Sequence, residues 1–224
     1  MNENIATDLI STGDVRRLEY DWYAGDIPGN VHLGEQVYID TTYGFAPFHS
    51  EGDPGLTIGN ASGAYDRTTF VVGPRGCVNV GAYTVLNGAY FVCNEHIEVG
   101  DHCLLAWGSV LTDTWPANGS SLPVSLRREV VRAISDDPSH RVPAFLAPRP
   151  IVLEDNVWVG FDAVVLSGVR VGRGSVVGCK TIVAEDVPPY AVGVGSPARI
   201  VRYLDADDTE EERSRSLREY ARIP

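Results

Sequence analysis

An aliphatic residue recurs every six positions between residues 151 and 190. These positions are Leu153, Val159, Val165, Val171, Val177 and Val183. Two residues before each stands a small or β-branched residue: Ile151, Val157, Ala163, Val169, Ser175 and Thr181. A helix would need a period of about 3.6, and a single strand a period of about two. A period of six is typical of a parallel β-helix, in which each hexad makes one flat side of a coil.

The same repeat runs less regularly upstream of residue 112. Its aliphatic positions are Val80, Leu86 and Val92, then, after one extra residue, Val99, Leu105 and Leu111. The preceding positions are Thr84, Tyr90, Ile97, Cys103 and Ser109. From Leu111 to Leu153 the distance is 42 residues, a multiple of six. We therefore predict that residues 112–150 form a long loop that leaves the coil and re-enters it beside its exit point.

The repeat divides the chain into three parts. Residues 1–55 are predicted to form an N-terminal cap and an early irregular coil, because a solenoid end must be covered. Residues 56–204 are predicted to form the hexapeptide-repeat β-helix. Outward loops are expected in the early coils, at 45–55 and 62–68. Pro188 and Pro189 end the repeat, since proline cannot donate to a strand ladder. Residues 205–224 are predicted to form a helix, because acidic residues precede basic ones, as the helix dipole favours.

Composition and charge exclude several classes of function. The net charge is −12, from 18 Lys and Arg against 30 Asp and Glu, so nucleic acid is not an expected partner. We see no apolar run long enough to span a membrane and no signal peptide, which favours a cytoplasmic protein. The four cysteines form no CxxC pair, and we expect them to be reduced packing residues rather than metal ligands.

The segment NVWVGFDAVVLSGVRVGRGSVVGCKTIVAEDVPPYAVGVGSPARIVRYL (156–204) resembles the C-terminal coils of the hexapeptide-repeat acyltransferases. It is similar to the maltose and galactoside acetyltransferases and to the xenobiotic acetyltransferases, in the pieces VWVG, LSGVRVG, VVG, DVPPYAV and GSPARIVR. The likeness is strong over 151–204 and moderate over 77–115. It implies an all-β protein with a left-handed parallel β-helix. It also implies a homotrimer, with acyl-CoA, such as acetyl-CoA, in a groove between neighbouring coils.

Carried over residue by residue, the resemblance places CoA contacts at Phe161, Cys179, Ala184, Arg199 and Arg202. Arginine forks suit the phosphates of CoA. Ala184 stands where the family often has threonine, and the next residue is Glu where the family often has lysine, so Lys180 is the cation that would compensate. Alternatively, the two arginines are solvated charges on an end strand.

The catalytic histidine of the resembled enzymes is missing from its usual place. Acyl transfer needs a base for the proton of the attacking hydroxyl or amine, and a neutral imidazole suits this role. This chain has Trp115 followed by proline where the family commonly has a His-Pro pair, and no histidine lies between Cys103 and Ser139. We therefore expect His140, in the long loop, to be a relocated base, with Asp113 as an orienting carboxylate.

Other residues are expected to face the acceptor. His96 is the second candidate for the base, and Asn87 and Asn94 correspond to positions that face acceptors in the family. Trp115 would close the cleft or stack on a flat acceptor. Alternatively, His140 is an exposed loop residue, and the two asparagines are corner residues that favour left-handed turns.

Three functions remain open on the sequence. The first is transfer of an acyl group from acyl-CoA to a hydroxyl or amine of a small polar acceptor. The second is a non-catalytic β-helix trimer that binds a ligand or a partner. The third is a zinc enzyme on the same fold, such as the γ-class carbonic anhydrases. It is disfavoured because His96 and His102, six residues apart, would stack on equivalent corners instead of converging, so no metal is expected.

Overall fold

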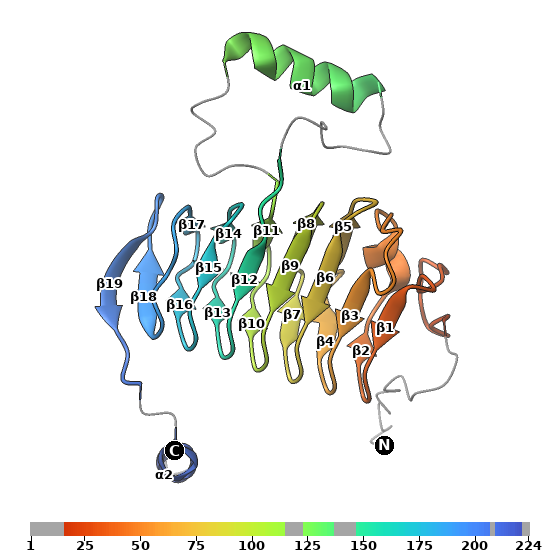
Figure 1. Ribbon diagram of the computed structural model, residues 1–224. Helices are drawn as coiled ribbons and strands as arrows, with labels where there is room; N and C mark the ends of the chain where they lie inside the picture. The colour runs from red at the N-terminus through yellow and green to blue at the C-terminus, as the bar shows by residue number, and fades with distance from the viewer. Residues whose placement is uncertain (1–15, 115–122, 137–146, 207–208, 221–224) are drawn as a thin grey trace.

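The computed structural model describes residues 16–114, 123–136, 147–206 and 209–220. Within them the chain winds into a parallel β-helix whose coils stack along one axis (Figure 1). Each regular coil contributes one strand to each of three sheets, which contain six, eight and five strands. His140 and Trp115 lie outside the described residues.

The strands of each sheet are short, as hexad repeats require. The six-stranded sheet contains β1 (Val31–Leu33), β3 (Leu56–Ile58), β6 (Cys77–Val80), β9 (His96–Val99), β12 (Ile151–Leu153) and β15 (Arg170–Val171). The eight-stranded sheet contains β2 (Tyr38–Ile39), β4 (Gly63–Tyr65), β7 (Val85–Asn87), β10 (Leu104–Leu105), β13 (Trp158–Val159), β16 (Val176–Val177), β18 (Ala191–Val194) and β19 (Arg199–Tyr203). The five-stranded sheet contains β5 (Thr69–Val72), β8 (Tyr90–Cys93), β11 (Val110–Thr112), β14 (Val164–Val165) and β17 (Ile182–Val183). Only the last described pair, β18 and β19, is antiparallel.

In the regular coils, the two positions that define each hexad point into the coil. The aliphatic positions from Leu153 to Val183 and the small positions two residues before them are all buried, which confirms the repeat. In the early coils the core is aromatic instead: Phe70 stacks between Phe45 and Phe91 with ring centroids 5.6 and 5.1 Å apart. The coil is therefore filled by columns of like side chains.

One coil departs from the predicted register. Phe91 and Cys93 are buried, whereas Tyr90 is exposed and Val92 is only half-buried, so the prediction that Tyr90 and Val92 occupy the hexad positions is wrong. Phe91 pairs with Leu111 across β8 and β11. The chain advances five residues from Leu86 to Phe91 but six from Leu105 to Leu111, and this one-residue difference shifts the alternation of inward and outward residues.

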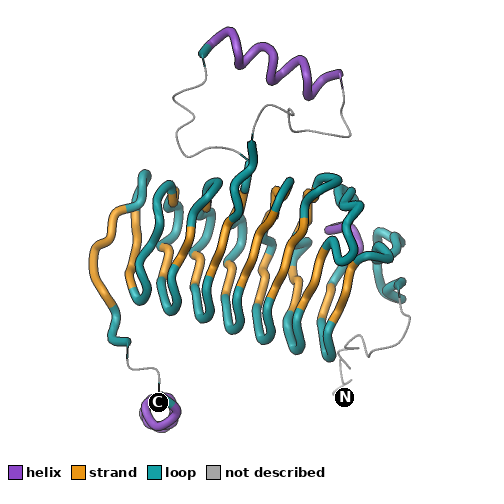
Figure 2. The backbone as a smooth tube through the Cα atoms, in the orientation of Figure 1, coloured by secondary structure: helices purple, strands orange, loops and turns teal. Residues whose placement is uncertain are grey.

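The long excursion re-enters the coil in phase, as predicted. Ile151 pairs with Ile97 of β9, and Val110 of β11 pairs with Val164 of β14. The excursion contains a helix that we did not predict, α1 (Val124–Asp136), which stands off one long edge of the stack of coils (Figures 1 and 2).

The two ends of the coil differ from its middle. In the first coil a short 3-10 helix, η1 (Thr42–Phe45), takes the place of a five-stranded-sheet strand. The predicted outward loop at 62–68 is wrong, because β4 lies there and pairs with β2 and β7. The predicted C-terminal helix is present as α2 (Glu210–Tyr220). Among the described residues, no helix combines the length and apolar character that crossing a membrane requires.

Candidate functional site

The turns that lead from the eight-stranded to the five-stranded sheet form a column that we call the aromatic corner. It comprises residues 40–41, 65–68, 87–89, 106–108, 160–162 and 178–180. The indole of Trp107 lies parallel to the ring of Phe161, with centroids 5.6 Å apart and planes 8° apart. Both rings are about half exposed (47% and 49%). A flat aromatic surface is therefore available along this corner.

Three of the predicted CoA contacts meet at this corner. The backbone N–H of Lys180 donates to the carbonyl of Phe161 at 2.7 Å, and Cys179 precedes Lys180 in the same turn. Cys179 and Lys180 are both exposed. The structure thus brings Phe161, Cys179 and Lys180 together on one edge of the coil.

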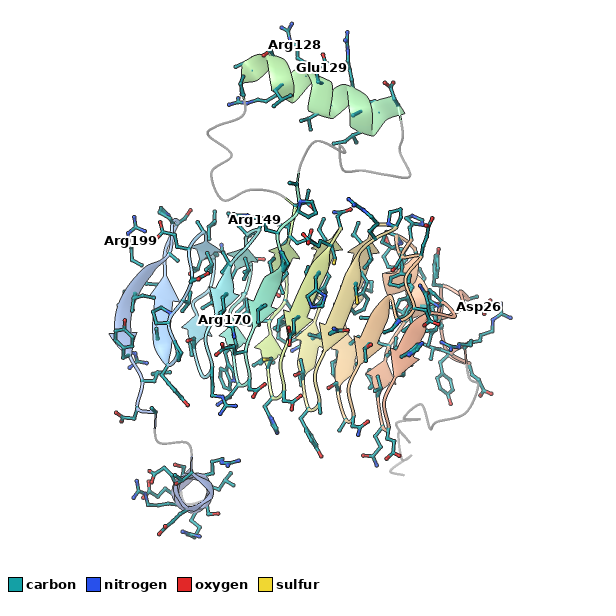
Figure 3. All side chains as sticks on the ribbon, in the orientation of Figure 1. Asp26, Arg128, Glu129, Arg149, Arg170 and Arg199 are labelled. Atoms are coloured by element: carbon teal, nitrogen blue, oxygen red, sulfur yellow. The ribbon has the colours of Figure 1, made fainter. Side chains whose placement is uncertain are left out.

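The segment after β18 folds back beside β17. The N–H of Ala198 donates to the carbonyl of Ile182 at 2.8 Å, and the N–H of Ile182 donates to Gly195 at 3.0 Å. Arg199 (Figure 3) therefore begins β19 next to the segment that is bonded to β17, while Lys180 precedes β17 and Ala184 follows it in the chain. Arg202 lies further along β19, opposite Val192. Apart from Phe161, the CoA contacts predicted from sequence thus lie in β19 or in the chain just before and after β17.

A second column, the loop corner, comprises the turns that lead from the five-stranded to the six-stranded sheet. Asp113 is fully buried there, and its carboxylate accepts the backbone N–H groups of residues 94–96 at 2.7 to 3.1 Å. The hydroxyl of Thr114 also donates to it, at 2.7 Å. These bonds satisfy both carboxylate oxygens, so Asp113 holds the turn between β8 and β9 and has no surface for a substrate.

His96, the second candidate for the base, does not present its ring to Asp113. The backbone N–H of His96 donates to Asp113, but its imidazole Nε2 lies 3.9 Å from Oε2 of Glu98. Burial and then the Asp113 carboxylate raise the pKa of the neighbouring Cys93 thiol. Within the described residues, the Asp113 carboxylate therefore orients backbone N–H groups and not a histidine ring.

The two asparagines lie on different corners. The Nδ2 of Asn94 donates to the hydroxyl of Thr114 at 2.8 Å, so Asn94 belongs to the loop corner. Asn87 ends β7 at the aromatic corner, opposite Tyr65 of β4. The two corners are the opposite edges of the five-stranded sheet, so one subunit does not bring Asn87 and Asn94 together.

Several residues of the site were missed from sequence. Trp107 follows Leu105 by two positions, as Phe161 follows Val159, so the repeat itself could have paired these rings. Arg149 lies at the base of the excursion (Figure 3). Its Nη2 donates to the carbonyl of Ser167 at 2.9 Å, and its backbone N–H donates to the backbone carbonyl of Asp113 at 2.8 Å. No sequence pattern indicated that this arginine belongs to the candidate site.

The outward-facing rows of the three sheets differ in character. The eight-stranded sheet presents Tyr38, Gly63, Val85, Leu104, Trp158, Val176 and Val192 in register. The five-stranded sheet presents Thr69, Tyr90, Val110, Val164 and Ile182. The six-stranded sheet presents His32, Thr57, Asn79, Glu98, Val152 and Arg170. Two faces are thus apolar and one is polar.

No grouping of three or more His, Cys, Asp or Glu placed to hold a metal ion occurs among the described residues.

No family model matches the chain. A candidate acetyltransferase of Schizosaccharomyces pombe is 46% identical over 56 residues, which are 25% of this chain and 27% of that protein. A 2,3,4,5-tetrahydropyridine-2,6-dicarboxylate N-acetyltransferase of Brevibacillus brevis is 48% identical over 57 residues, or 25% of this chain and 24% of that protein. The chain thus matches about a quarter of these relatives' length.

The solved structures extend the comparison over most of the coil. A variant of AntD, an N-acyltransferase from Bacillus cereus in complex with dTDP and coenzyme A, aligns with a TM-score of 0.62 and 17% identity. The alignment covers 84% of this chain and 91% of that one. The fold expected from the sequence, a left-handed parallel β-helix, is therefore confirmed. The resemblance to the hexapeptide-repeat acyltransferases is confirmed as well, by relatives named acetyltransferases and by neighbours that are acyltransferases.

Proposed function

We propose that this protein transfers an acyl group from acyl-CoA to an amine or hydroxyl of a small acceptor. The observation that carries the proposal is the grouping of Phe161, Cys179 and Lys180 on one edge of the coil, next to the turn at 195–198, which is bonded to β17 and leads into Arg199. Aromatic surface and exposed backbone suit the pantetheine arm, and the cations suit the phosphates. The N-acyltransferase AntD, which shares the fold, was crystallised with coenzyme A.

The transfer itself needs one bond exchange. The lone pair of the acceptor nitrogen or oxygen attacks the thioester carbonyl carbon, and the carbon–sulfur bond then breaks. The acceptor's proton passes to a base and finally to the leaving thiolate, which departs as the CoA thiol. His140 is our first candidate for that base and His96 the second, while Asp113 positions the turn that carries Asn94 and His96.

The active unit is proposed to be a homotrimer. The outward rows of the eight- and five-stranded sheets are apolar, and Trp158, Tyr90 and Ile182 are exposed on them to 54%, 45% and 36%. Faces of this kind are typical of subunit interfaces. The loop corner of one subunit would then meet the aromatic corner of the next, bringing Asn94 and Asn87 into one cleft. We expect this assembly in the cytoplasm.

Calorimetry with CoA and acetyl-CoA, followed by a thiol-release assay, tests the proposal. Binding of both and slow thioester consumption without acceptor are expected. Arg199→Gln should weaken CoA binding roughly tenfold, because one charge-assisted hydrogen bond is lost. Arg17→Gln, in the N-terminal cap, is the matched control and should bind normally. Binding of CoA without any transfer to a wide panel of amines and alcohols would favour the second candidate, a non-catalytic trimer that lacks the usual histidine.

A further inference from the structure

The aromatic corner continues beyond Trp107 into a cluster that the proposed CoA contacts do not use. The indole Nε1 of Trp107 donates to a carboxylate oxygen of Asp66 at 2.6 Å. Tyr38 and Tyr65 stack beside them, with ring centroids 4.8 Å apart and planes 23° apart. Asp40 completes the cluster, since its carboxylate accepts the backbone N–H of the residue after Asp66 at 3.2 Å. We call these five residues the aromatic–acidic shelf.

A glycine makes this arrangement possible. Gly88 has a positive φ of 53°, and a Cβ there would lie 3.3 Å from Cδ1 of Trp107 and 3.2 Å from the carbonyl oxygen of Asp66. Because that space holds no side chain, the indole can lie across the turn and span from Phe161 to Asp66. The shelf is therefore joined directly to the line of predicted CoA contacts.

The shelf has a negative charge that no described basic side chain neutralises. The ion pairs of the described residues include neither Asp40 nor Asp66. Burial raises the pKa of Asp40, and the nearby Asp66 carboxylate adds to the effect. Burial also raises the pKa of Tyr38, as do the charges of both aspartates. A cation placed between these groups would remove the repulsion.

The exposed faces of the shelf suit a cation as well. Tyr65 and Trp107 are exposed to 36% and 47%, so a ligand can reach their rings. A cation over a tyrosine or tryptophan face is attracted by the ring quadrupole, and nearby carboxylates add direct attraction. Two kinds of group that both attract ammonium thus lie at the same place.

We propose that the shelf binds an ammonium group of the acyl acceptor, so that the acceptor is a small polyamine-like or amino-substituted molecule. This inference rests on the proposed function. The bound ammonium and the group that is acylated are different groups of the acceptor, because a protonated amine has no lone pair with which to attack the thioester. The shelf therefore selects and orients the acceptor, while its second, neutral amine or hydroxyl reacts.

Putrescine is the probe, with 1,4-butanediol as its uncharged analogue. Titration of the whole protein with putrescine, followed by the NMR signal of the Trp107 indole N–H, should show saturable binding that weakens at high salt. Butanediol should leave the signal unchanged. Asp66→Asn and, separately, Tyr65→Leu should each weaken putrescine binding roughly tenfold. Asp205→Asn, at the other end of the coil, is the matched control.

Calorimetry with CoA on the same samples separates the two proposals. Normal CoA binding with no response to putrescine would overturn the shelf as an amine site and leave the acyltransferase proposal intact. Putrescine binding without CoA binding would support the shelf and contradict the acyltransferase proposal. Because Tyr65→Leu leaves the Trp107–Asp66 bond in place, it tests the shelf even where Asp66→Asn loosens the turn. Unchanged putrescine affinity in the Tyr65 variant would also count against the shelf.

Discussion

The rings of Trp107 and Phe161 lie parallel, 5.6 Å apart, although 54 residues separate them in the sequence. The excursion lies between them, and the two turns become neighbours only because β10 pairs with β13. This stack joins the residues that we assign to CoA with those that we assign to the acceptor.

Phe161→Ala should therefore weaken CoA binding by about tenfold, since an aromatic contact and its apolar area are both lost. Calorimetry of the variant against the parent measures the change. Tyr83→Ala, which removes an exposed ring on another corner, should bind CoA normally. Equal loss in both variants would show that the effect is general destabilisation.

Cys179 should be the most reactive thiol of the chain toward a maleimide, because it is exposed whereas Cys93 and Cys103 are buried. Burial raises the pKa of Cys103 to about 11, so its reactive thiolate is scarce at neutral pH. Saturating CoA should slow labelling at Cys179, which peptide mass spectrometry can follow. Labelling at the same rate with and without CoA would place the cofactor elsewhere.

Asp113→Ala should lower the free energy of unfolding by on the order of 3 kcal/mol, because three part-buried backbone N–H groups lose their acceptor. Urea denaturation gives the value. Asp205→Ala, an exposed residue outside the coil, is the control and should change little. A loss below about 1 kcal/mol in Asp113→Ala would mean that the turn finds other acceptors.

Glu154 should contribute stability that depends on pH. The backbone N–H of Arg173 and, less strongly, the side chain of Arg170 lower the pKa of its carboxyl, against an opposing effect of burial. Its contribution is complete above the ordinary glutamate pKa of about 4.3 and is lost as pH falls through the lower folded-state value. Glu154→Gln should thus be less stable than the parent at pH 7 by about 1 kcal/mol at most. Urea midpoints that differ as much at pH 2 as at pH 7 would contradict this account.

The proposed trimer predicts which face tolerates charge. Trp158→Glu and Ile182→Glu lie on the two apolar faces and should yield smaller species in analytical ultracentrifugation. Asn79→Glu, on the polar six-stranded sheet, should leave the assembly unchanged. A monomeric parent protein would exclude the proposed shared cleft.

The sequence predicts the regular coils well because each hexad has one aliphatic residue that points inward, and no other residue of the hexad suits that inward position. The prediction for Tyr90 and Val92 failed because the step from β7 to β8 is one residue shorter, which shifts the alternation, and apolar residues on both faces of β8 hide that shift. The helix α1 was missed because it lies in the excursion, outside the hexad repeat, and only Val130 among its side chains is buried.

The site was predicted only in part. Phe161, Cys179 and Lys180 follow from the repeat and the resemblance. Asp66 could not be placed from the sequence, because it lies in an early coil whose turns have irregular lengths. Its partner, Trp107, is also two coils away. His140 and Trp115 stay predictions.

The hydrogen bond between Arg149 N–H and the Asp113 carbonyl closes the neck of the excursion. Strands on either side of it pair as if the 35 intervening residues were absent. The excursion is therefore a replaceable module: it can be lengthened, shortened or exchanged at little cost to the coil. Under the proposed function the candidate base His140 belongs to this module, so the base would change by substitutions here while the stacked hexads beneath it stay the same.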